Sequence, residues 1–305
     1  MQKKTLSFPS PELLTQRPPF PRKVMIQTTS RCNSGCVFCP YREVRKEFPQ
    51  GEMEEDLFQS ILDELSRYKE VERVIPYLMN EPLCDKRIIS WIYRIKERLP
   101  WVQVHILTNG INLHSRLRKE LLNSPLDWVG ISIHAIRADT YRRFTGREDF
   151  PEILRRITLF VQEAMEKRGE DFVMINITRV PGFLTEEEKE EAILYWKNLG
   201  VKRIEYYPAP VSRAGNITWL SRIRHTRIKG CRSIWRNEMI HILYHGEVVL
   251  CCMDWRREMV MGNVRENSLK DIWNSPRYME VESWIRGEGN PPPDFLCFRC
   301  EEAEE

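Results

Sequence analysis

The chain has 305 residues, of which 42% are hydrophobic, 30% are charged and nine are cysteine, with a formal net charge of +3. A chain of this length buries a sizeable core and fits one large domain with a small addition. The small charge argues against a nucleic-acid partner. No apolar run approaches the roughly 18 residues that span a bilayer, so no membrane partner is expected. Nine cysteines without a signal peptide indicate metal ligation in a reducing cytoplasm.

Short apolar or β-branched runs alternate with amphipathic helical runs over residues 23–207. The predicted strands, each flanked by polar or turn residues, are Lys23–Thr28, Arg73–Leu78, Val102–Thr108, Trp128–His134, Phe172–Thr178 and Arg203–Tyr207. The predicted helices are Glu55–Tyr68, Lys86–Leu99, Pro151–Arg168 and Thr185–Leu199. Thr185 and Glu188 have the spacing of a capping box at the start of the last helix.

Six β/α repeats imply a parallel sheet with right-handed crossovers, and they are too few to close an eight-stranded barrel. We therefore predict an α/β fold, a partial (β/α)6 TIM-like barrel with its active site at the carboxyl ends of the strands. After Pro208 the chain becomes loop-rich and basic, with Arg222, Arg224, Arg227 and Lys229. The predicted units are an N-terminal extension, the barrel, a basic linker and a cysteine-rich domain, at 1–22, 23–207, 208–230 and 231–305.

Three cysteines follow the first predicted strand with the spacing C-x3-C-x2-C, at Cys32, Cys36 and Cys39. Three thiolates can hold three irons of a cubane cluster and leave the fourth iron without a protein ligand. A zinc knuckle usually has paired C-x2-C units and four ligands. The alternative is a zinc site or three unrelated buried thiols.

The local sequence Cys32-Asn-Ser-Gly-Cys36-Val-Phe-Cys39-Pro resembles the signature of the radical S-adenosylmethionine (SAM) superfamily, including the aromatic residue before the third cysteine. The resemblance implies that SAM binds the open iron through its amino and carboxylate groups. It also implies that the reduced cluster cleaves SAM to a 5′-deoxyadenosyl radical, which removes a hydrogen atom from a substrate C–H bond.

Residues at two strand ends fit the same resemblance. Met79-Asn80-Glu81-Pro82 resembles the superfamily's Gly-Gly-Glu-Pro segment, whose glutamate contacts the amino group of SAM. A carboxylate suits an ammonium partner. Asn109 lies in a Thr-Asn-Gly turn that is frequent in the family at this position, although a glycine turn needs no functional explanation.

The fourth and fifth strands add further cofactor-binding candidates. Ser132 is similar to serines that reach the ribose or carboxylate of SAM in related enzymes. Arg147 and Asn176 are candidates by position alone. His134 is either a packed, hydrogen-bonded histidine or a catalytic one.

A second set of cysteines, Cys231, Cys251, Cys297 and Cys300, supplies the four thiolates that complete the coordination of a second cubane cluster. The segments 246–254, 262–264 and 269–273 resemble the SPASM domain. The chain ends soon after Cys300, so the match is to the shortened twitch form with one auxiliary cluster. The resemblance thus implies SAM and two 4Fe–4S clusters as cofactors, with a zinc site as the alternative for the second set.

Three further residues concern the step after hydrogen abstraction. In an oxidation, an electron passes to the auxiliary cluster, and Asp254 or Arg213 serves as base or hydrogen-bonding residue to the substrate. In an epimerisation, the thiol of Cys252 returns a hydrogen atom to the opposite face. Cys252 alternatively only packs, as Cys84 does.

The predicted function is therefore radical oxidation of a small polar or anionic metabolite, such as an aminocyclitol or sugar. Some enzymes similar in domain layout oxidise an aminocyclitol alcohol to a ketone. Alternatives are epimerisation of a peptide or aminoglycoside, cross-linking of a ribosomal peptide, and an iron–sulfur electron carrier without turnover. The expected partners are a small-molecule or peptide substrate and an electron donor, which is a reductase, flavodoxin or ferredoxin. The basic linker is either a solvated face or indicates an anionic substrate, such as a phosphate or carboxylate compound, and a nucleic-acid-modifying role is a further alternative.

Overall fold

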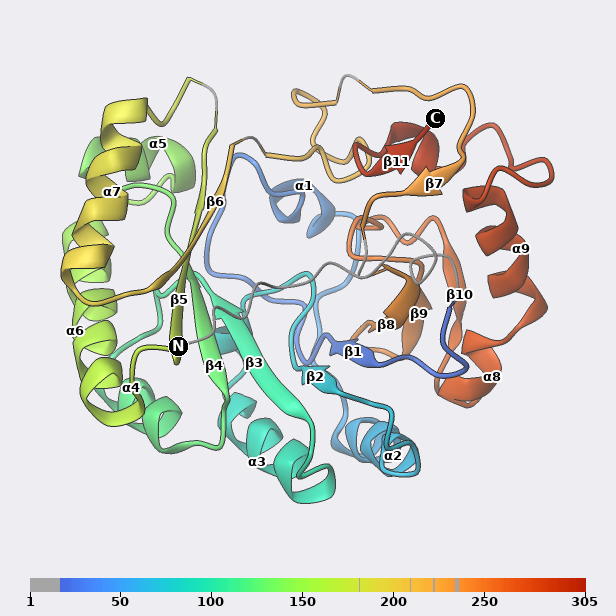
Figure 1. Cartoon of the computed structure of the whole chain (residues 1–305), viewed down its shortest axis with the longest axis horizontal. Helices are drawn as coiled ribbons and strands as arrows, with labels where there is room; N and C mark the ends of the chain where they lie inside the picture. Colours follow the sequence, from blue (N-terminus) through green and yellow to red (C-terminus); the bar gives the residue numbers. More distant parts are fainter. Residues whose placement is uncertain (1–16, 181, 209, 222, 234–235) are drawn as a thin grey trace, which may run out of the picture.

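The computed structural model describes residues 17–180, 182–208, 210–221, 223–233 and 236–305. A curved sheet runs through the molecule, with helices along the outer side of its barrel half (Figure 1). A loop-rich unit with two short helices lies at the other end. The predicted α/β architecture, an open barrel followed by a small cysteine-rich unit, is confirmed. Arg222 of the predicted basic linker lies outside the described residues.

The sheet of the described residues has the strand order β10-β9-β8-β1-β2-β3-β4-β5-β6. Its six barrel strands pair in parallel and are β1 (Lys23–Ile26), β2 (Arg73–Ile75), β3 (Gln103–Thr108), β4 (Trp128–Ser132), β5 (Val173–Thr178) and β6 (Arg203–Tyr207). The other strands are β8 (Met239–Ile242), β9 (Glu247–Val249) and β10 (Val260–Asn263), with a separate pair formed by β7 (Gly230–Cys231) and β11 (Ala303–Glu304).

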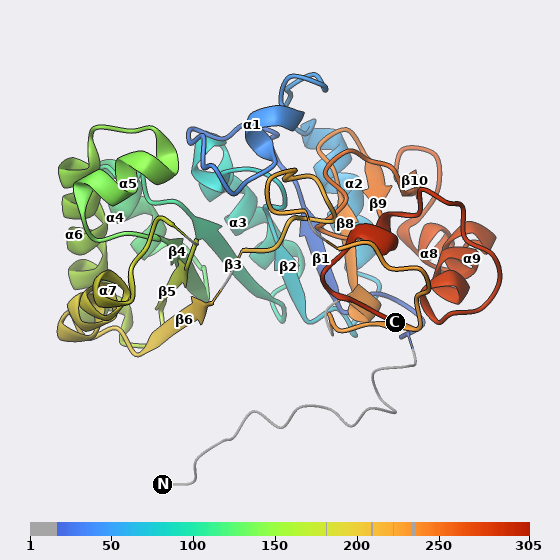
Figure 2. The ribbon, with the colours of Figure 1, turned by 90° about the horizontal axis from the view of Figure 1, so that it is seen from above.

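The four predicted helices are present as α2 (Glu55–Leu65), α3 (Ile88–Arg98), α6 (Phe150–Arg168) and α7 (Glu186–Asn198). Seen from above, the helices of the barrel half lie outside the arc of strands (Figure 2). The sequence analysis did not predict α1 (Tyr41–Val44), α4 (Ser115–Asn123), α5 (Ala138–Thr145), α8 (Leu269–Trp273) and α9 (Pro276–Ile285), nor the 3-10 turns η1 (Pro82–Cys84), η2 (Arg236–Glu238) and η3 (Leu296–Arg299).

The two faces of the barrel strands have different surroundings because successive side chains on a strand point to opposite sides. On β1, Val24 and Ile26 join the main core with the helices, whereas Met25 packs with Ile75 and Met239. Met25 therefore marks the inner face of the barrel.

The cysteine-rich unit continues the barrel sheet. β8 pairs in parallel with all four residues of β1, from Lys23↔Met239 to Ile26↔Ile242. A hydrogen bond also joins the unit to the barrel half: the backbone N–H of Leu269 donates to Glu64 at 2.9 Å. The barrel and the cysteine-rich unit thus share one sheet.

The predicted N-cap of α7 is present, since the Thr185 hydroxyl accepts from the backbone N–H of Glu188 at 3.2 Å. The reciprocal contact of the capping box, from the Thr185 backbone N–H to the Glu188 carboxylate, was predicted wrongly. The Glu188 carboxylate is buried and accepts instead from Thr140 Oγ1 at 2.7 Å and from backbone N–H groups of Ile136 and Arg137. Glu188 therefore ties α7 to the segment that follows β4.

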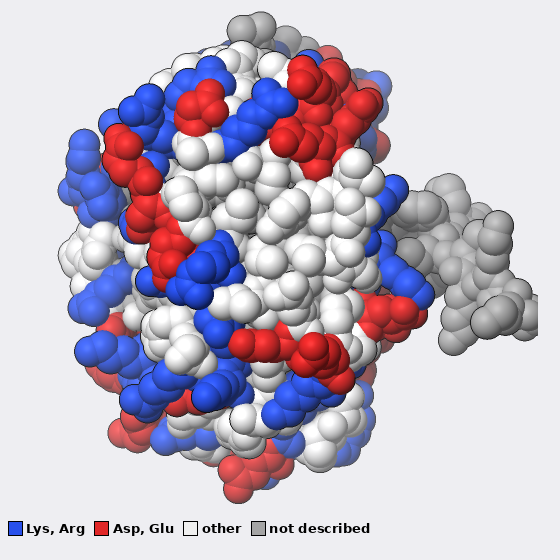
Figure 3. All heavy atoms as spheres, turned by 90° about the vertical axis from the view of Figure 1, so that its left-hand side faces the viewer, with Lys and Arg blue, Asp and Glu red and all other residues white. Residues whose placement is uncertain are grey.

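The outer face that carries α5, α6 and α7 shows acidic and basic side chains side by side (Figure 3). Many of them form ion pairs there, such as Arg156 with Glu152 and Arg137 with Glu191. Exposed pairs of this kind contribute little to stability but keep the surface free of a single-sign field. In the described part of the chain, no helix combines the length and apolarity that crossing a membrane requires.

Candidate active site

The loop after β1 brings three half-buried thiols together, and all three are free. The Ser34 hydroxyl lies 3.1 Å from the sulfur of Cys36, and the backbone N–H of Cys39 donates to the carbonyl of Cys36 at 3.1 Å. The pKa of Cys39 is raised to about 12, first by burial and then by the charge of Cys36. Binding of iron favours the thiolate form and opposes this shift.

An amide network fixes the backbone of this loop. The side chain of Asn33 accepts from Asn109 Nδ2 at 2.8 Å and donates to Asn112 Oδ1 at 3.0 Å. The Asn112 amide also donates to the carbonyl of Leu83 at 2.9 Å. On the other side, the Tyr41 hydroxyl accepts from the backbone N–H of Cys32 at 2.8 Å. The loop is thus held against the turns that follow β2 and β3.

Glu81 lies at the centre of these turns with only 3% of its surface exposed. Its carboxylate accepts from Thr108 Oγ1 at 2.6 Å and from the backbone N–H groups of Asn109 and Leu83 at 2.7 and 3.0 Å. A carboxylate has about four acceptor positions, so about one remains for a ligand. Burial raises the pKa of Glu81 to about 7, and an ammonium partner would restore its charge.

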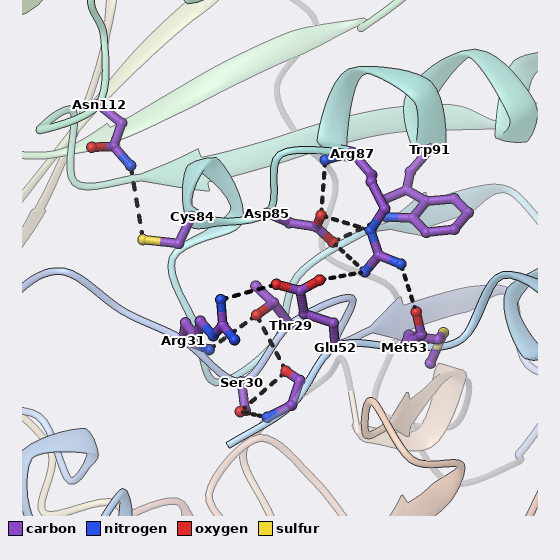
Figure 4. Close-up of polar contacts among 11 residues, drawn as sticks. Thr29, Ser30, Arg31, Glu52, Met53, Cys84, Asp85, Arg87, Trp91 and Asn112 are labelled. Atoms are coloured by element: carbon purple, nitrogen blue, oxygen red, sulfur yellow. Dashed lines mark hydrogen bonds and ion pairs between the residues drawn. The ribbon is translucent and has the colours of Figure 1, made fainter.

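A second, ionic network supports the same turns (Figure 4). Glu52 lies between Arg31, at 3.1 Å, and Arg87, at 3.5 Å. Arg87 in turn pairs with Asp85 at 3.1 Å, and Asp85 also accepts from Trp91 Nε1 at 3.0 Å. This network joins the residue before Cys32 to the start of α3, so the positions of the cysteine loop and of the Glu81 turn are coupled.

Cys84 lies on the rim of the same turn. Its sulfur is 3.8 Å from Asn112 Nδ2, and it is half-buried (Figure 4). Burial raises its pKa to about 11. These contacts fit the expected packing role of Cys84.

Ser132 and Asn176 are direct neighbours in register at the carboxyl ends of β4 and β5. Neither side chain forms a hydrogen bond within the described residues. His134 differs, because its Nδ1 accepts from the backbone N–H of Thr178 at 3.0 Å, and burial lowers its pKa to about 4. Ser132 and Asn176 are therefore available to a ligand, whereas His134 is a hydrogen-bonded, neutral histidine.

Two predicted cofactor contacts have other partners. The side chain of Arg147 forms a bidentate pair with Asp149, at 2.9 and 2.5 Å, and reaches the carbonyl of Asn33 at 3.3 Å. The side-chain amide of Asn109 is occupied by Asn33 and by the backbone N–H of Ile111. Both residues contact the cysteine loop or the Glu81 turn, so these contacts favour a positioning role over direct contact with SAM.

The second set of thiols comes from three separate segments. Cys231 pairs in β7 with Ala303 of β11. Cys297 lies within the 3-10 turn η3 and Cys300 caps its C-terminal end, and both are buried. The pKa of Cys251 is raised, first by burial and then by the charges of Cys252, Cys297 and Cys300. The pKa of Cys300 is raised to about 12, chiefly by burial, with a contribution from Cys231. The four thiols thus lie near one another.

A cubane cluster and a single zinc ion differ in the distance between their thiolate ligands. Four sulfurs around one zinc ion lie within about 4 Å of one another, given Zn–S bonds of about 2.3 Å. Among the described residues, no three Cys, His, Asp or Glu side chains converge closely enough to hold a single ion. A cubane has a larger body and holds its cysteines farther apart. Three and four free thiols are the donor sets that an open and a closed cubane cluster take.

The carboxylate of Asp254 accepts hydrogen bonds from two backbone N–H groups. It is fully buried, and its two carboxylate oxygens accept from the backbone N–H groups of Glu258 and Met259 at 2.8 and 2.9 Å. Burial raises its pKa to about 6. These contacts close the turn after Cys252 and leave Asp254 poorly placed for the predicted role as a base.

Cys252 adjoins Cys251 of the second set, and Arg213 lies near Cys39 of the first. The pKa of Tyr77 is raised, first by burial and then by the charge of Cys252, so this thiol is near the Tyr77 ring. The Arg213 guanidinium lies 3.6 Å from the sulfur of Met253, and its charge lowers the pKa of Cys39. Arg213 also has a left-handed backbone, with φ of 55°, which is strained for a residue other than glycine.

Comparison with known proteins gives the family. A model described as the radical SAM superfamily matches residues 26–204, more than half of the chain. The chain belongs to the radical SAM superfamily. A second model, described as an iron–sulfur cluster-binding domain, matches residues 231–301. The protein is therefore a radical SAM enzyme with a SPASM-type domain, and SAM and 4Fe–4S clusters are its cofactors.

Two curated relatives match most of the chain. The SAM-dependent 2-deoxy-scyllo-inosamine dehydrogenase of Niallia circulans is 21% identical over 277 residues, 91% of each protein. The tungsten-containing aldehyde ferredoxin oxidoreductase cofactor-modifying protein of Pyrococcus furiosus is 24% identical over 303 residues, covering 86% of this chain and 82% of the relative.

Two solved structures share the fold. BtrN in complex with AdoMet and 2-DOIA has a TM-score of 0.61 at 18% identity, with 95% of both chains covered. Streptococcus suis SuiB bound to precursor peptide SuiA has a TM-score of 0.68 at 13% identity, with 94% of this chain and 71% of SuiB covered. At these identities the likeness concerns the fold.

Several residues of the site were missed by the sequence analysis. Asn33 and Asn112 hold the cysteine loop, Tyr41 caps its first amide, and Tyr77 faces Cys252. Asn33 lies inside the cysteine signature, which is the one sequence signal that could have found it. The others become visible only when residues distant in sequence meet.

Proposed function

We propose that this enzyme oxidises an alcohol carbon of a small polar metabolite, with an aminocyclitol or amino sugar as the substrate class. The proposal is supported by the position of Arg213, which lies near Cys39 of the first set of thiols and touches Met253, two residues from Cys251 of the second. It is also supported by the similarity over 91% of each protein to a 2-deoxy-scyllo-inosamine dehydrogenase.

Each set of cysteines supplies the thiolate ligands of one iron–sulfur cluster. Cys32, Cys36 and Cys39 would hold an open cluster, and Cys231, Cys251, Cys297 and Cys300 a closed one. When bound, SAM and the first cluster supply a hydrogen-abstracting 5′-deoxyadenosyl radical, and the second cluster supplies a one-electron acceptor. Glu81 would bind the amino group of SAM through its remaining acceptor position, with Ser132 and Asn176 along the rest of the molecule.

The remaining task of the chain is to place the substrate between the two sets of thiols and to exclude water. In the oxidation the alcohol loses one hydrogen atom, one proton and one electron. Arg213 would donate a hydrogen bond to the reacting oxygen and stabilise the charge that develops there. The electron donor is a further partner, since enzymes of this superfamily need one, and we propose a flavodoxin, ferredoxin or reductase for this role.

Epimerisation is the second candidate, because Cys252 is a free thiol beside Tyr77 in the same region. A thiol there could return a hydrogen atom to the substrate, and no net electron would leave. A peptide substrate, as in the SuiB complex with its precursor peptide, is the less supported version of either reaction.

The test is a product assay on the anaerobically reconstituted protein with 2-deoxy-scyllo-inosamine and SAM. Oxidation predicts one ketone per 5′-deoxyadenosine, and the Cys252→Ala variant keeps forming it. An epimerase would instead give inverted alcohol that disappears in the Cys252→Ala variant. Cys84→Ala serves as the matched control thiol. Absence of both 5′-deoxyadenosine and product at every substrate concentration would contradict the proposed function.

A further inference from the structure

A row of polar side chains crosses the inner face of the barrel at the level of the cofactor candidates. Asn176 pairs in register with Ser132 on one side and with Glu205 on the other. On β6, Ile204 and Tyr206 pack against the main core, so Glu205 and Tyr207 point to the opposite, inner side. Glu205 thus continues the row toward the open edge of the barrel.

Glu205 has one hydrogen bond in the described residues, from the Tyr207 hydroxyl to its Oε2 at 2.8 Å. Both residues are exposed, and Glu205 forms no ion pair within the described part of the chain. This differs from the carboxylates of α6 and α7, such as Glu152 and Glu187, which pair with arginines. The Glu205 carboxylate therefore keeps most of its hydrogen-bonding capacity for a ligand.

The pair lies near Tyr77 and Arg213, which are themselves near one residue of each cysteine region. The charges of both Tyr207 and Glu205 act on Tyr77, whose ring lies near Cys252. Arg213 acts on Tyr207 and on Cys39. Glu205 and Tyr207 thus lie in the same neighbourhood as Arg213 and Cys252.

The chemistry of the pair selects one kind of group. Tyr207 uses its proton on Glu205, so its oxygen offers only lone pairs to a ligand, and a carboxylate is likewise acceptor-only. A protonated amine has three donors and no acceptor, and it carries the opposite charge. A phosphate or carboxylate would be repelled here and would have to lie at Arg213 instead.

We propose that Glu205 and Tyr207 form the subsite that binds a protonated amine of the substrate. This rests on the proposed function, because it uses the same substrate position, and it assigns the residues that bind the amine carried by an aminocyclitol or amino sugar. It also revises the expectation of an anionic substrate, because the free carboxylate rather than the basic linker faces this position.

The test measures binding, not turnover, by anaerobic calorimetry on the reconstituted full chain with SAM. Three pairs of probes differ only in an amine or a hydroxyl at one carbon: 2-deoxy-scyllo-inosamine, glucosamine and a lysine-containing peptide, each with its hydroxyl counterpart. The wild type should bind the amine member of at least one pair about 10-fold more tightly or better, the size expected of a charge-assisted hydrogen bond.

Glu205→Gln should abolish that preference, Glu205→Asp should restore part of it, and Tyr207→Phe should reduce it. Glu187→Gln, on the outer helix α7, is the matched control and should leave it unchanged. The affinity for SAM should stay the same in all four variants. The subsite is overturned if no pair shows an amine preference, if the preference survives in Glu205→Gln, or if that variant loses SAM instead.

The outcomes separate this inference from the proposed function. A preference confined to glucosamine or the peptide keeps the subsite and removes the aminocyclitol. Oxidation of 2-deoxy-scyllo-inosamine without any amine preference keeps the proposed function and removes the subsite.

Discussion

The two sets of cysteines are built in opposite ways. The first has three thiols within eight residues of one loop, all half-buried, and the loop follows a strand of the same sheet that carries Ser132 and Asn176 at its strand ends. The second has four thiols spread over 70 residues, two of them buried, and its segments are joined by the β7–β11 pair.

This difference teaches how one chain separates chemistry from electron storage. Three ligands leave one iron open, and the nearby polar groups are placed to orient what binds there. Four ligands close a cluster, so it has no position for a substrate. The long sequence span of the second set also makes it a cross-link between distant parts of the fold.

The largest expected effect comes from removing all three thiols of the first set. The triple variant Cys32→Ala, Cys36→Ala, Cys39→Ala should reduce SAM cleavage to the rate measured without protein, because no cluster remains for SAM to bind. Its iron content should fall from roughly eight to roughly four per chain, since the second set is untouched. Chromatographic assay of 5′-deoxyadenosine with iron analysis measures both. SAM cleavage that persists in this variant would contradict the assignment of the SAM-cleaving cluster to the first set.

The reverse experiment removes the second set. Cys231→Ala should also lower the iron content to roughly four per chain, but SAM cleavage should continue while ketone formation stops. The midpoint of thermal unfolding should fall, since the cross-link between β7 and η3 is lost. The same assay and calorimetry check this, with Cys84→Ala as control. Ketone formation at the wild-type rate would show that the second set takes no part in oxidation.

Glu81→Gln tests whether the open site uses a charged partner for SAM. The Kd for SAM should rise about 10- to 100-fold, because a charge-assisted hydrogen bond contributes ~1.5–3 kcal/mol. The pKa of Glu81 is about 7, so its ionised fraction, and with it SAM affinity, should fall as the pH drops below about 7. Calorimetric titrations from pH 6 to 8 should show this slope in the wild type and not in the variant.

Glu55→Gln, an exposed carboxylate on α2, is the control and should bind SAM as the wild type does. An unchanged Kd in Glu81→Gln would mean that its three present hydrogen bonds are its whole role. The first cysteine set would then lack the charged SAM contact that distinguishes it here from the second set.

The smallest expected effect concerns the amide network. Asn109→Ala removes the donor to Asn33 and should raise the Kd for SAM about 3- to 10-fold, in line with ~0.5–1.5 kcal/mol for each lost hydrogen bond. The iron content should stay that of the wild type, and the electron paramagnetic resonance change on adding SAM should be altered. Asn198→Ala at the exposed end of α7 is the control. Loss of iron together with affinity would mean that the network holds the cluster rather than the position of SAM.

Much of the barrel was predictable because its strands are local features. The six strands and four of the helices have apolar periodicities within one segment, and the cysteine spacing lies in one loop. The polar helix α4 was missed because only Leu117, Leu121 and Leu122 provide its apolar side. The pairing of β8 with β1 joins residues more than 200 positions apart, which no local pattern indicates.

The sequence located the strand ends that carry the candidate residues, but not the hydrogen-bond partners of those residues. Glu81, Ser132 and Asn176 lie at the expected strand ends. Arg147 was assigned by position and Asp254 as a candidate base; in the structure, Arg147 pairs with Asp149 and Asp254 closes a turn. Position along the chain does not reveal such partners, because a charged side chain satisfies the nearest partner, and that partner is set by the folded geometry.

The most direct test of the contrast between an open and a closed cluster is Mössbauer spectroscopy on the anaerobically reconstituted protein, with and without SAM. The account predicts roughly eight irons per chain, of which one changes its spectrum when SAM is added while the others stay unchanged. Roughly four irons per chain, or a spectrum that SAM leaves unaltered, would contradict it.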